Sequence, residues 1–393
     1  MASAQGTPWV WFNSGDEVFP AMLEAIGAAR VSIRLESYIF SGDTIGRSFL
    51  GALIEARRRG VSVRVLVDAI GSLTLPDSFW SPLREAGGEA RFFNPLNLRR
   101  FEIRNHRKLL VCDERVAFIG GVHTAPRQQG GGGAGGGPGG QGRGRRSGGG
   151  GRDIGVRIEG TVAAELGYSF DEMFELAEFR HKRPARLRKP KLKRAVEESA
   201  TEMLLLGGPG RGRNPIKRRL LSDLSEASDI RVMAAYFLPT GRLRRLLIRR
   251  ARRGGRVQLI LPSRSDVPLA QLATQSLYRR LLKAGVEIHE YQPQILHAKL
   301  LVMDDIVYAG SANLDPRSLS INYELMVRFH DFTAATQARR LFDDAQKQSR
   351  RVELAELKGR GTFWMRLKRR WAHFLLARVD PYIARRQWRA LPD

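Results

Sequence analysis

The feature that most limits the possible folds of this 393-residue chain is an internal repeat. Three blocks of sequence in the first half return in the same order in the second half. The matched blocks are ARVSIRLESYIF at 29–40 with ASDIRVMAAYFL at 227–238, GRSFLGALIEARRRGVSVRVLVD at 46–68 with GRLRRLLIRRARRGGRVQLILP at 241–262, and LREAGGEARFFNP at 83–95 with LLKAGVEIHEYQP at 281–293. Because the order of the blocks is kept, we interpret the chain as a duplicated unit rather than as α/β sequence that is alike by chance.

Each copy alternates apolar strands with amphipathic helices. In the first copy we expect a helix over 17–29, a strand at Val31–Phe40, a helix at Ile45–Arg59, a strand at Val61–Asp68, a helix near Ser81–Ala86 and a strand around Arg91–Phe93. Such alternation is typical of mostly parallel sheets with helices on both faces. The predicted fold class is therefore α/β, with two mostly parallel or mixed sheets flanked by helices. A pseudo-twofold axis would relate the sheets and place a site at their interface.

The repeat also divides the chain into segments. We expect an N-terminal half at 8–179, a basic linker at 180–200, a C-terminal half at 201–350 and a basic amphipathic helical segment at 351–393. Within the first half, the glycine-rich stretch 130–151 is expected to form a flexible, solvated loop.

The chain is strongly basic, with 66 Lys and Arg against 40 Asp and Glu and a formal net charge of +26. Such a charge attracts polyanions, so nucleic acid and an anionic membrane surface are the first partners to consider. The single cysteine, Cys112, excludes an intrachain disulfide, and its apolar surroundings predict a small buried side chain rather than a reactive thiol. We find neither a signal peptide in 1–15 nor an apolar run that could span a bilayer, so membrane contact is expected from one side only.

The segment Thr362–Val379 predicts a basic amphipathic helix. Its apolar residues at helical spacing are Phe363, Trp364, Leu367, Trp371, Phe374 and Leu375, and arginines and lysines fill much of the remaining surface. Interfacial tryptophans beside basic residues suit the surface of an anionic bilayer, and an ordinary helix packed on the core is the alternative. A second amphipathic piece at Pro381–Leu391 favours the membrane.

Two of the seven histidines begin the same pattern at matching points of the repeat. The pattern, H-x-K-x4-D, comprises His106, Lys108 and Asp113 in the first copy and His297, Lys299 and Asp304 in the second. An apolar run follows each lysine, which predicts a strand beside which the histidine and the lysine point to the same side. A pseudo-twofold pairing of the halves would bring both His-Lys pairs into one cleft.

Other polar residues follow the two patterns. They are Ser311, Asn313 and Glu324 in the second copy, and His123 and Asp153 in the first. Without the glycine-rich insert, Asp153 would follow its histidine at about the same spacing as Glu324 follows His297. The two carboxylates are therefore predicted to occupy equivalent places.

Paired H-x-K-x4-D patterns with a following G-S-x-N are similar to those of the phospholipase D superfamily. The wider sequence resembles the bacterial cardiolipin synthases, specifically the shorter type without N-terminal transmembrane helices. The segments that carry the resemblance are FPAMLEAI, IRLESYIF, NHRKLLVCDERVAFIGG, RDIGVRIEG, LHAKLLVMDD and GSANLDPRSLSINYE. They run from about residue 19 to 324 and so cover most of the chain.

The resemblance implies a role for each residue of the pattern. His106 would be the nucleophile that forms a phosphohistidine and His297 the general acid and base, an assignment that the residues alone leave open because the repeat is symmetric. Lys108, Lys299, Ser311 and Asn313 would bind phosphate oxygens, and Glu324 and Asp153 would hold the second nitrogen of each imidazole. Asp113 and Asp304 would be structural supports. His123 stands where the family has asparagine, either as a substitute phosphate contact or as a plain loop residue.

The function expected on this basis is transfer of a phosphatidyl group to phosphatidylglycerol, without metal or other cofactor. The expected partners are phospholipids and an anionic membrane surface, on the cytoplasmic side of a bacterial cell membrane, with no obligate protein partner. A phospholipase D with water as acceptor is the nearest alternative. A nuclease of the same superfamily is less favoured, because its short nucleases carry one motif and this chain carries two. A basic scaffold protein without catalysis is the remaining alternative.

Overall fold

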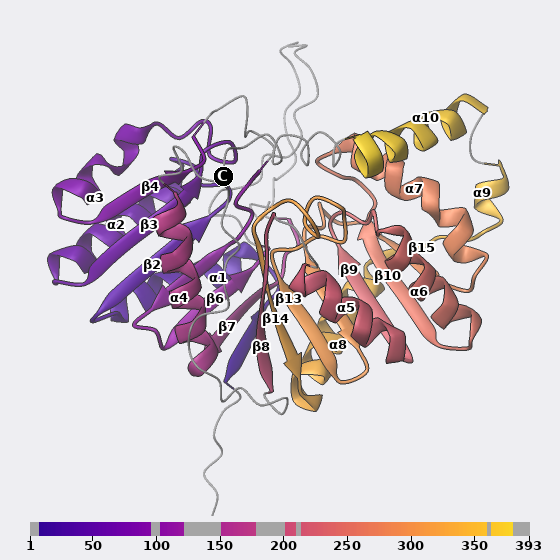
Figure 1. The fold of residues 1–393 in the computed structure, drawn as a ribbon, viewed down its shortest axis with the longest axis horizontal. Helices are drawn as coiled ribbons and strands as arrows, with labels where there is room; N and C mark the ends of the chain where they lie inside the picture. The colour runs from indigo at the N-terminus through magenta and orange to yellow at the C-terminus, as the bar shows by residue number, and fades with distance from the viewer. Residues whose placement is uncertain are drawn as a thin grey trace, which may run out of the picture.

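The computed structural model describes residues 8–95, 103–121, 151–177, 201–209, 214–359 and 363–379. His123, most of the glycine-rich stretch 130–151, the basic linker 180–200 and the piece Pro381–Leu391 lie outside the described residues. The chain forms two α/β halves that stand side by side in Figure 1.

The first half builds a seven-stranded sheet in the order β1-β7-β6-β5-β2-β3-β4. Its elements are β1 (Trp9–Phe12), α1 (Gly15–Ala28), β2 (Ser32–Ser37), α2 (Thr44–Arg58), β3 (Ser62–Asp68), a 3-10 turn (Asp77–Trp80), α3 (Ser81–Glu85), β4 (Glu89–Phe93), β5 (Leu109–Cys112), β6 (Val116–Gly120), β7 (Gly155–Glu159) and α4 (Thr161–Leu176). Each of the six expected elements of this half is present within a few residues of its predicted bounds.

The second half builds an eight-stranded sheet in the order β15-β11-β10-β9-β12-β13-β14-β8. Its elements are β8 (Glu202–Gly207), α5 (Pro215–Glu226), β9 (Asp229–Ala234), α6 (Gly241–Arg252), β10 (Arg256–Pro262), α7 (Pro268–Leu282), β11 (Glu287–Tyr291), β12 (Lys299–Met303), β13 (Ile306–Gly310), β14 (Glu324–His330), α8 (Phe332–Lys347) and β15 (Ser349–Arg351). Short helix α9 (Glu356–Gly359), helix α10 (Phe363–Phe374) and a π-helical turn (Leu375–Val379) follow. Apart from β15, the strand order is that of the first sheet, which confirms the duplicated fold.

Both sheets are mixed, and their parallel part is smaller than the alternation of strands and helices led us to expect. Strands β2, β3 and β4 are parallel to one another, as are β9, β10 and β11, because a helix crosses over between each pair. From β5 and β12 onward the pairs are antiparallel. Tight turns follow β5 and β12, where Asp113, Glu114 and Asp304 adopt positive φ angles, and these turns make the antiparallel pairs β5–β6 and β12–β13.

Helices cover both faces of each sheet. One core cluster lies between the first sheet and α1 to α3, and a second lies under α5 to α7 in the second half. A third cluster joins the halves, with Phe170 of α4 and Phe342 of α8 among its members. At this junction Trp9 of β1 packs against Phe329 of β14 and donates from its ring nitrogen to Gln337 of α8 at 3.2 Å. The two halves therefore share one apolar core, which fixes their relative position.

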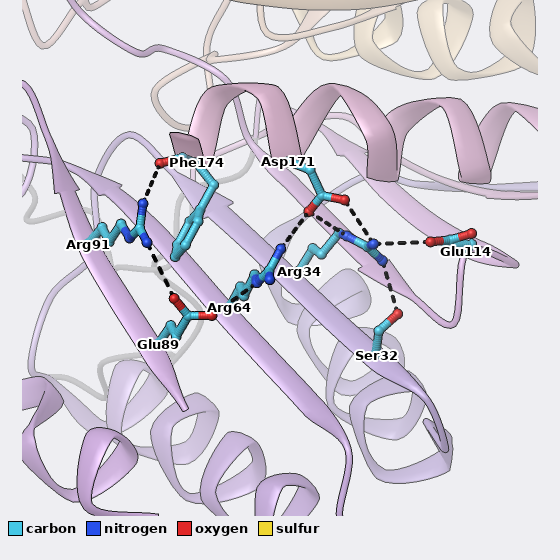
Figure 2. Close-up of polar contacts among 8 residues, drawn as sticks. All are labelled: Ser32, Arg34, Arg64, Glu89, Arg91, Glu114, Asp171 and Phe174. Atoms are coloured by element: carbon cyan, nitrogen blue, oxygen red, sulfur yellow. Dashed lines mark hydrogen bonds and ion pairs between the residues drawn. The ribbon is translucent and has the colours of Figure 1, made fainter. Parts of the chain in front are cut away.

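A cluster of charged residues fastens α4 to the outer strands of the first sheet (Figure 2). Arg34, Arg64 and Arg91 stand on β2, β3 and β4, and Asp171 of α4 accepts two bonds from Arg34, each of 2.9 Å. Arg91 lies over the ring of Phe174 at 4.1 Å. The second half repeats the main contact with Arg231 of β9 and Asp343 of α8, 2.7 Å apart.

Candidate active site

The segment that carries His106 is held against the opposite half of the molecule. Asn105 forms an isolated parallel bridge with Tyr323, the His106 amide donates to the Tyr323 carbonyl at 3.0 Å, and the Tyr323 amide donates to the Arg104 carbonyl at 2.9 Å. The segment runs directly into β5. His106 is consequently fixed at the boundary between the two sheets.

His297 is held in the equivalent way. Arg152 of the first half bridges Leu296, its amide donates to the Ile295 carbonyl at 3.0 Å, and the His297 amide donates to the Arg152 carbonyl at 2.8 Å. Each histidine segment therefore pairs with the residue that immediately precedes a carboxylate of the other half.

These bridges place the two predicted carboxylates on the two imidazoles. The Nδ1 atom of His106 lies 3.0 and 3.1 Å from the two carboxylate oxygens of Glu324, and the Nδ1 atom of His297 lies 2.8 Å from Asp153. The equivalence of the carboxylates is also seen in the strand register, because Asp153 and Glu324 each stand two residues before the partner of the last glycine of the preceding strand. The pairing crosses between halves, so neither half contains a complete histidine–carboxylate unit.

Both Nδ1 atoms lie next to a carboxylate oxygen, which favours a proton on Nδ1, although the Nδ1 atom of His297 also lies 3.0 Å from Nζ of Lys299. In addition to Asp153, the Nδ1 atom of His297 lies 3.2 Å from the carbonyl oxygen of Gly121. With Nδ1 protonated, the Nε2 atom of a neutral imidazole carries the lone pair and is the atom available for chemistry.

The environment of His106 keeps its imidazole neutral. Burial lowers the pKa of His106 from 6.5 to about 4, Glu324 opposes this shift, and the positive charges of Lys108 and Lys299 add to it. Burial alone would raise the pKa of Glu324, but its contacts with His106, Lys108 and Ser311 outweigh that effect and lower it. An ionised Glu324 beside a neutral His106 suits a nucleophile that is oriented but not protonated.

Both motif lysines are buried next to their histidines. Lys108 donates to the carbonyl oxygen of His106 at 2.7 Å, and Lys299 donates to that of His297 and lies 3.0 and 3.1 Å from its two ring nitrogens. A buried ammonium group is stabilised by nearby negative charge, and the carboxylates of Glu36 and Glu324 both interact electrostatically with Lys108. The prediction that each histidine and lysine point to the same side is thus met in both halves.

Ser311 contacts Glu324. Its hydroxyl donates to Glu324 and accepts from the Leu325 amide at 3.0 Å, and the phosphate contact predicted for it stays a prediction. The structure therefore gives Ser311 a part in orienting Glu324. In the first half Gly121 takes the place of Ser311, and a Cβ atom there would lie only 2.1 Å from an Asp153 oxygen.

Asn313 remains a candidate for phosphate binding. Its side chain is buried, and the NH2 group of its amide could donate a hydrogen bond to a phosphate oxygen. His123 occupies the matching position in the first copy, and it lies outside the described residues.

The motif aspartates are not brought to the histidines. Asp113, at the far end of β5, accepts hydrogen bonds from the backbone amides of Arg30, Val31 and Ser32 at 2.7–2.9 Å. Asp304 accepts in the same way from the amides of Ser228 and Asp229. Both carboxylates tie the turn after the motif strand to the start of the neighbouring strand.

Two tyrosines lie beside the histidines, at matching positions of the repeated blocks 29–40 and 227–238, and sequence analysis gave them no role. The Tyr38 ring stands edge-on to His106 with ring centroids 4.8 Å apart, and the Tyr236 ring stands edge-on to His297 at 6.5 Å. The hydroxyl of Tyr236 donates to Asp266 at 2.7 Å. Their matching positions at the ends of β2 and β9 were the available signal.

A buried polar network beneath His106 was also missed. Glu36 accepts from the Asn105 amide group at 2.7 Å and pairs with Arg107 at 3.1 Å, while Asp68 pairs with Arg104 at 3.2 Å. These contacts fix the residues on both sides of His106. Across the described ranges, no group of three or more His, Cys, Asp and Glu side chains is arranged to hold a metal ion, and no helix is long and apolar enough to cross a membrane.

A duplicated α/β fold in which each half supplies a histidine, a lysine and the carboxylate for the other half's histidine defines a phospholipase-D-like enzyme. The family model described as "Cardiolipin synthase, PLD-like domain" matches residues 22–127 and 220–345. The chain belongs to this family, and it is accordingly an enzyme of the phosphatidyltransferase class.

Individual proteins agree with this placement. Cardiolipin synthase B of Salmonella typhi is 35% identical over 333 residues, which cover 82% of this chain and 76% of that protein. Cardiolipin synthase 1 of Bacillus anthracis is 29% identical over 360 residues, or 89% of this chain and 69% of that protein. Among solved structures, the phosphatidylserine synthase of Haemophilus influenzae Rd KW20 superposes with a TM-score of 0.73 at 13% identity and covers 96% of this chain and 95% of its own, which supports the fold.

Proposed function

We propose that this protein is a cardiolipin synthase that transfers a phosphatidyl group to a hydroxyl of phosphatidylglycerol through a phosphohistidine. The observation that carries the proposal is the crossed pairing of His106 with Glu324 and of His297 with Asp153. It leaves two Nε2 atoms for a two-step displacement at phosphorus. The two curated relatives named above, both cardiolipin synthases, suggest the substrate class.

In the first step, the Nε2 atom of neutral His106 attacks the phosphorus atom of the donor lipid. The bond from phosphorus to the headgroup oxygen breaks, and the departing oxygen takes a proton from Nε2 of protonated His297. The product alcohol leaves, and the phosphatidyl group stays on His106. The lowered pKa of His106 favours this assignment, because the nucleophile must be unprotonated at a pH at which the general acid is protonated.

In the second step, His297 acts as the base. Its Nε2 atom takes the proton from a hydroxyl group of phosphatidylglycerol, and the resulting oxygen attacks phosphorus and displaces His106. Cardiolipin forms, and both histidines return to their starting states. When the donor is also phosphatidylglycerol, the alcohol released in the first step is glycerol.

Lys108 and Lys299 would stabilise the charge on the phosphate oxygens in both steps. Their ammonium groups are buried within 3.1 Å of histidine atoms, so little reorganisation is needed when phosphate arrives. The Asn313 side chain would add a hydrogen bond from the second half.

The proposal is tested by incubating the purified protein with vesicles that contain phosphatidylglycerol and identifying the products by mass spectrometry. Cardiolipin and glycerol are expected, and both should be lost in His106→Ala. His330→Ala is the matched control, because His330 is exposed at the end of β14. Phosphatidic acid without cardiolipin would make water the acceptor and the protein a phospholipase.

We further propose that the enzyme acts from the cytoplasmic side of a bacterial cell membrane as a peripheral protein. Support comes from its net charge of +26, which favours anionic lipid surfaces. Salt washing of membrane fractions and protease treatment of spheroplasts test the two parts of this statement. Release by salt and protection from external protease are the expected results.

A further inference from the structure

Large apolar side chains exposed to solvent are unevenly distributed. The described residues include twelve large apolar side chains that are exposed. Eight of them lie on three segments, namely the loop after β3, the start of α7, and α10 with the turn that follows it. The eight are Leu73, Val267, Leu269, Trp364, Met365, Trp371, Phe374 and Leu375. Exposed apolar residues that gather on a few segments mark an interaction surface.

Helix α10 has an apolar face in addition to the one that it buries. Ala372 is buried against Ala273 of α7 and Leu238, and this contact holds the helix on the second half (Figure 1). A different stripe, at positions 364, 367, 371, 374 and 375, follows helical spacing. In this stripe Trp371 is 56% exposed and Phe374 is 51% exposed, with their rings in an edge contact of 6.0 Å. The stripe thus faces away from the protein.

All three segments are connected to the two histidines through short chains of contacts. On the second half, Leu238, which packs on Ala372, follows Tyr236, and the Tyr236 ring faces His297. Val267 directly follows Asp266, which accepts the Tyr236 hydroxyl. The apolar residues of α7 and α10 therefore lie near the Tyr236 side of the site.

The loop after β3 makes the corresponding contacts on the first half. Leu73 directly follows Ser72, whose hydroxyl donates to the Tyr38 carbonyl at 3.3 Å and accepts from the Phe40 amide at 2.9 Å. The Tyr38 ring faces His106. The segments with exposed apolar residues are thus joined by contacts to Tyr38 on the first half and to Tyr236 on the second, the tyrosines whose rings face the two histidines.

Basic residues border the apolar stripe of α10. Lys368 and Arg370 are exposed, one on each side of the stripe. An apolar stripe with tryptophan and flanking cations matches the boundary of an anionic bilayer, where rings enter among the acyl chains and cations meet phosphate. A protein partner would instead favour an apolar centre with few lysines.

We propose that α10, the start of α7 and the Leu73 loop form one docking face that inserts into the headgroup boundary of an anionic bilayer and turns the two histidines toward it. The reaction in the previous section is not needed for the docking itself. It is needed only for the consequence that lipid reaches the histidines directly from the docked bilayer.

Binding to vesicles tests the docking face without any activity measurement. Co-sedimentation is measured with phosphatidylcholine vesicles with and without phosphatidylglycerol, for the full chain and for the double variant Trp371→Ser/Phe374→Ser. Wild-type protein should bind only the anionic vesicles, and the double variant should bind them at least about tenfold more weakly. Phe332→Ser is the matched control, because Phe332 is 68% exposed at the start of α8, on a different element. Equal binding by the double variant and wild type would overturn the proposal.

Two further measurements keep the interpretation specific. Tryptophan quenching by brominated acyl chains should occur in the wild type and decrease in Trp371→Phe, a variant that keeps an aromatic ring. The oligomeric states of the wild type and the double variant are also compared without lipid. If the wild type forms an oligomer and the double variant does not, the face is a contact between copies and the proposal fails.

Activity separates the docking face from the proposed reaction. On monomeric short-chain phosphatidylglycerol, the double variant should keep wild-type kcat, while on vesicles its rate should fall at least about tenfold. Wild-type binding to vesicles without turnover of any lipid would leave the docking face standing and remove the proposed function. If the wild type turns over lipid but the double variant binds vesicles as well as the wild type does, the proposed function would stand and the docking face would be removed.

Discussion

The Nδ1 atom of His106, in the first half of the chain, lies 3.1 Å from a carboxylate oxygen of Glu324, in the second half. The contact spans 218 residues of sequence. Because Asp153 and His297 repeat it in the opposite sense, each half completes the other half's histidine.

Replacing Glu324 by Gln should damage catalysis without weakening lipid binding. The amide can present an N–H group to Nδ1 and favour the wrong imidazole tautomer, so kcat should fall by roughly 10²- to 10⁴-fold. Steady-state kinetics on vesicles, with vesicle binding measured in parallel, checks this. Glu353→Gln, a change of the same chemistry after β15, is the control. A loss confined to KM would contradict a role in orienting His106.

The two histidines should differ in their ability to form the covalent intermediate. His106→Ala removes the attacking nitrogen and should give no phosphoenzyme with any substrate. His297→Ala removes the proton donor, so it should still form phosphoenzyme when the leaving group needs no proton, and should then hydrolyse it slowly. Acid-quenched labelling with a phosphodiester of a nitrophenol checks both. Label on the His106→Ala protein would reverse the assignment.

The pH dependence of phosphoenzyme formation should show the low basicity of His106. In His297→Ala with the same nitrophenol ester, formation should be half-maximal near pH 4, because the pKa of His106 is lowered to about 4 by burial and by Lys108. In Lys108→Gln the midpoint should move upward, since a positive charge that disfavours protonation has been removed. Lys283→Gln, an exposed change at the end of α7, should leave it unchanged. A midpoint near 6.5 in the His297→Ala protein would contradict the effect of burial.

The same shift predicts how stability responds to acid. Between about pH 6.5 and pH 4 an unfolded chain binds a proton at His106 that the folded protein does not bind. Folding stability from this group is therefore complete above pH 6.5 and decreases as the pH falls through that window. His106→Gln should reduce the acid sensitivity of the free energy of unfolding.

Ser311→Gly should act through Glu324 rather than through phosphate. The change copies Gly121 of the first half and removes the hydroxyl that donates to Glu324. We expect kcat to fall, with KM unchanged, and the pH midpoint of phosphoenzyme formation to shift. An increase in KM with an unaltered pH midpoint would instead support the direct phosphate contact that the sequence led us to expect.

Asp171→Asn should lower stability but leave the site intact. Asp171 accepts two bonds from Arg34, whose side chain is only 12% exposed, so the loss should be about 1.5–3 kcal/mol. Asp344→Asn is the control, because Asp344 pairs with Lys347 on the surface of α8 and should leave the melting temperature unchanged. Thermal unfolding and kcat on short-chain lipid check both variants. Loss of kcat at low temperature in Asp171→Asn would contradict a purely structural role.

Much of the fold could be predicted because it depends on local pattern. The alternation that produced β2, α2 and β3 is carried by consecutive residues, and the repeat predicted the second set from the first. The antiparallel part was underestimated, in part because the β5–β6 and β12–β13 hairpins depend on positive φ angles at Asp113 and Asp304. Backbone conformation at a single turn residue is a weaker signal than the periodicity of a strand.

The sequence by itself predicted which residues would carry the chemistry. The spacing of His106 to Lys108 and of His297 to Lys299 is a property of short segments, and the duplication placed them at matching points. Asp153 and Glu324 could be chosen as partners on the same basis.

Only the tertiary structure decided which carboxylate serves which histidine. The backbone bridges of Asn105 with Tyr323 and of Arg152 with Leu296 carry each carboxylate across to the other half, and no spacing along the chain encodes that exchange. The structure also gave Ser311 its contact with Glu324 and turned the apolar stripe of α10 outward. These outcomes depend on how two sheets share one apolar core, a long-range balance of packing that neither repeat contains on its own.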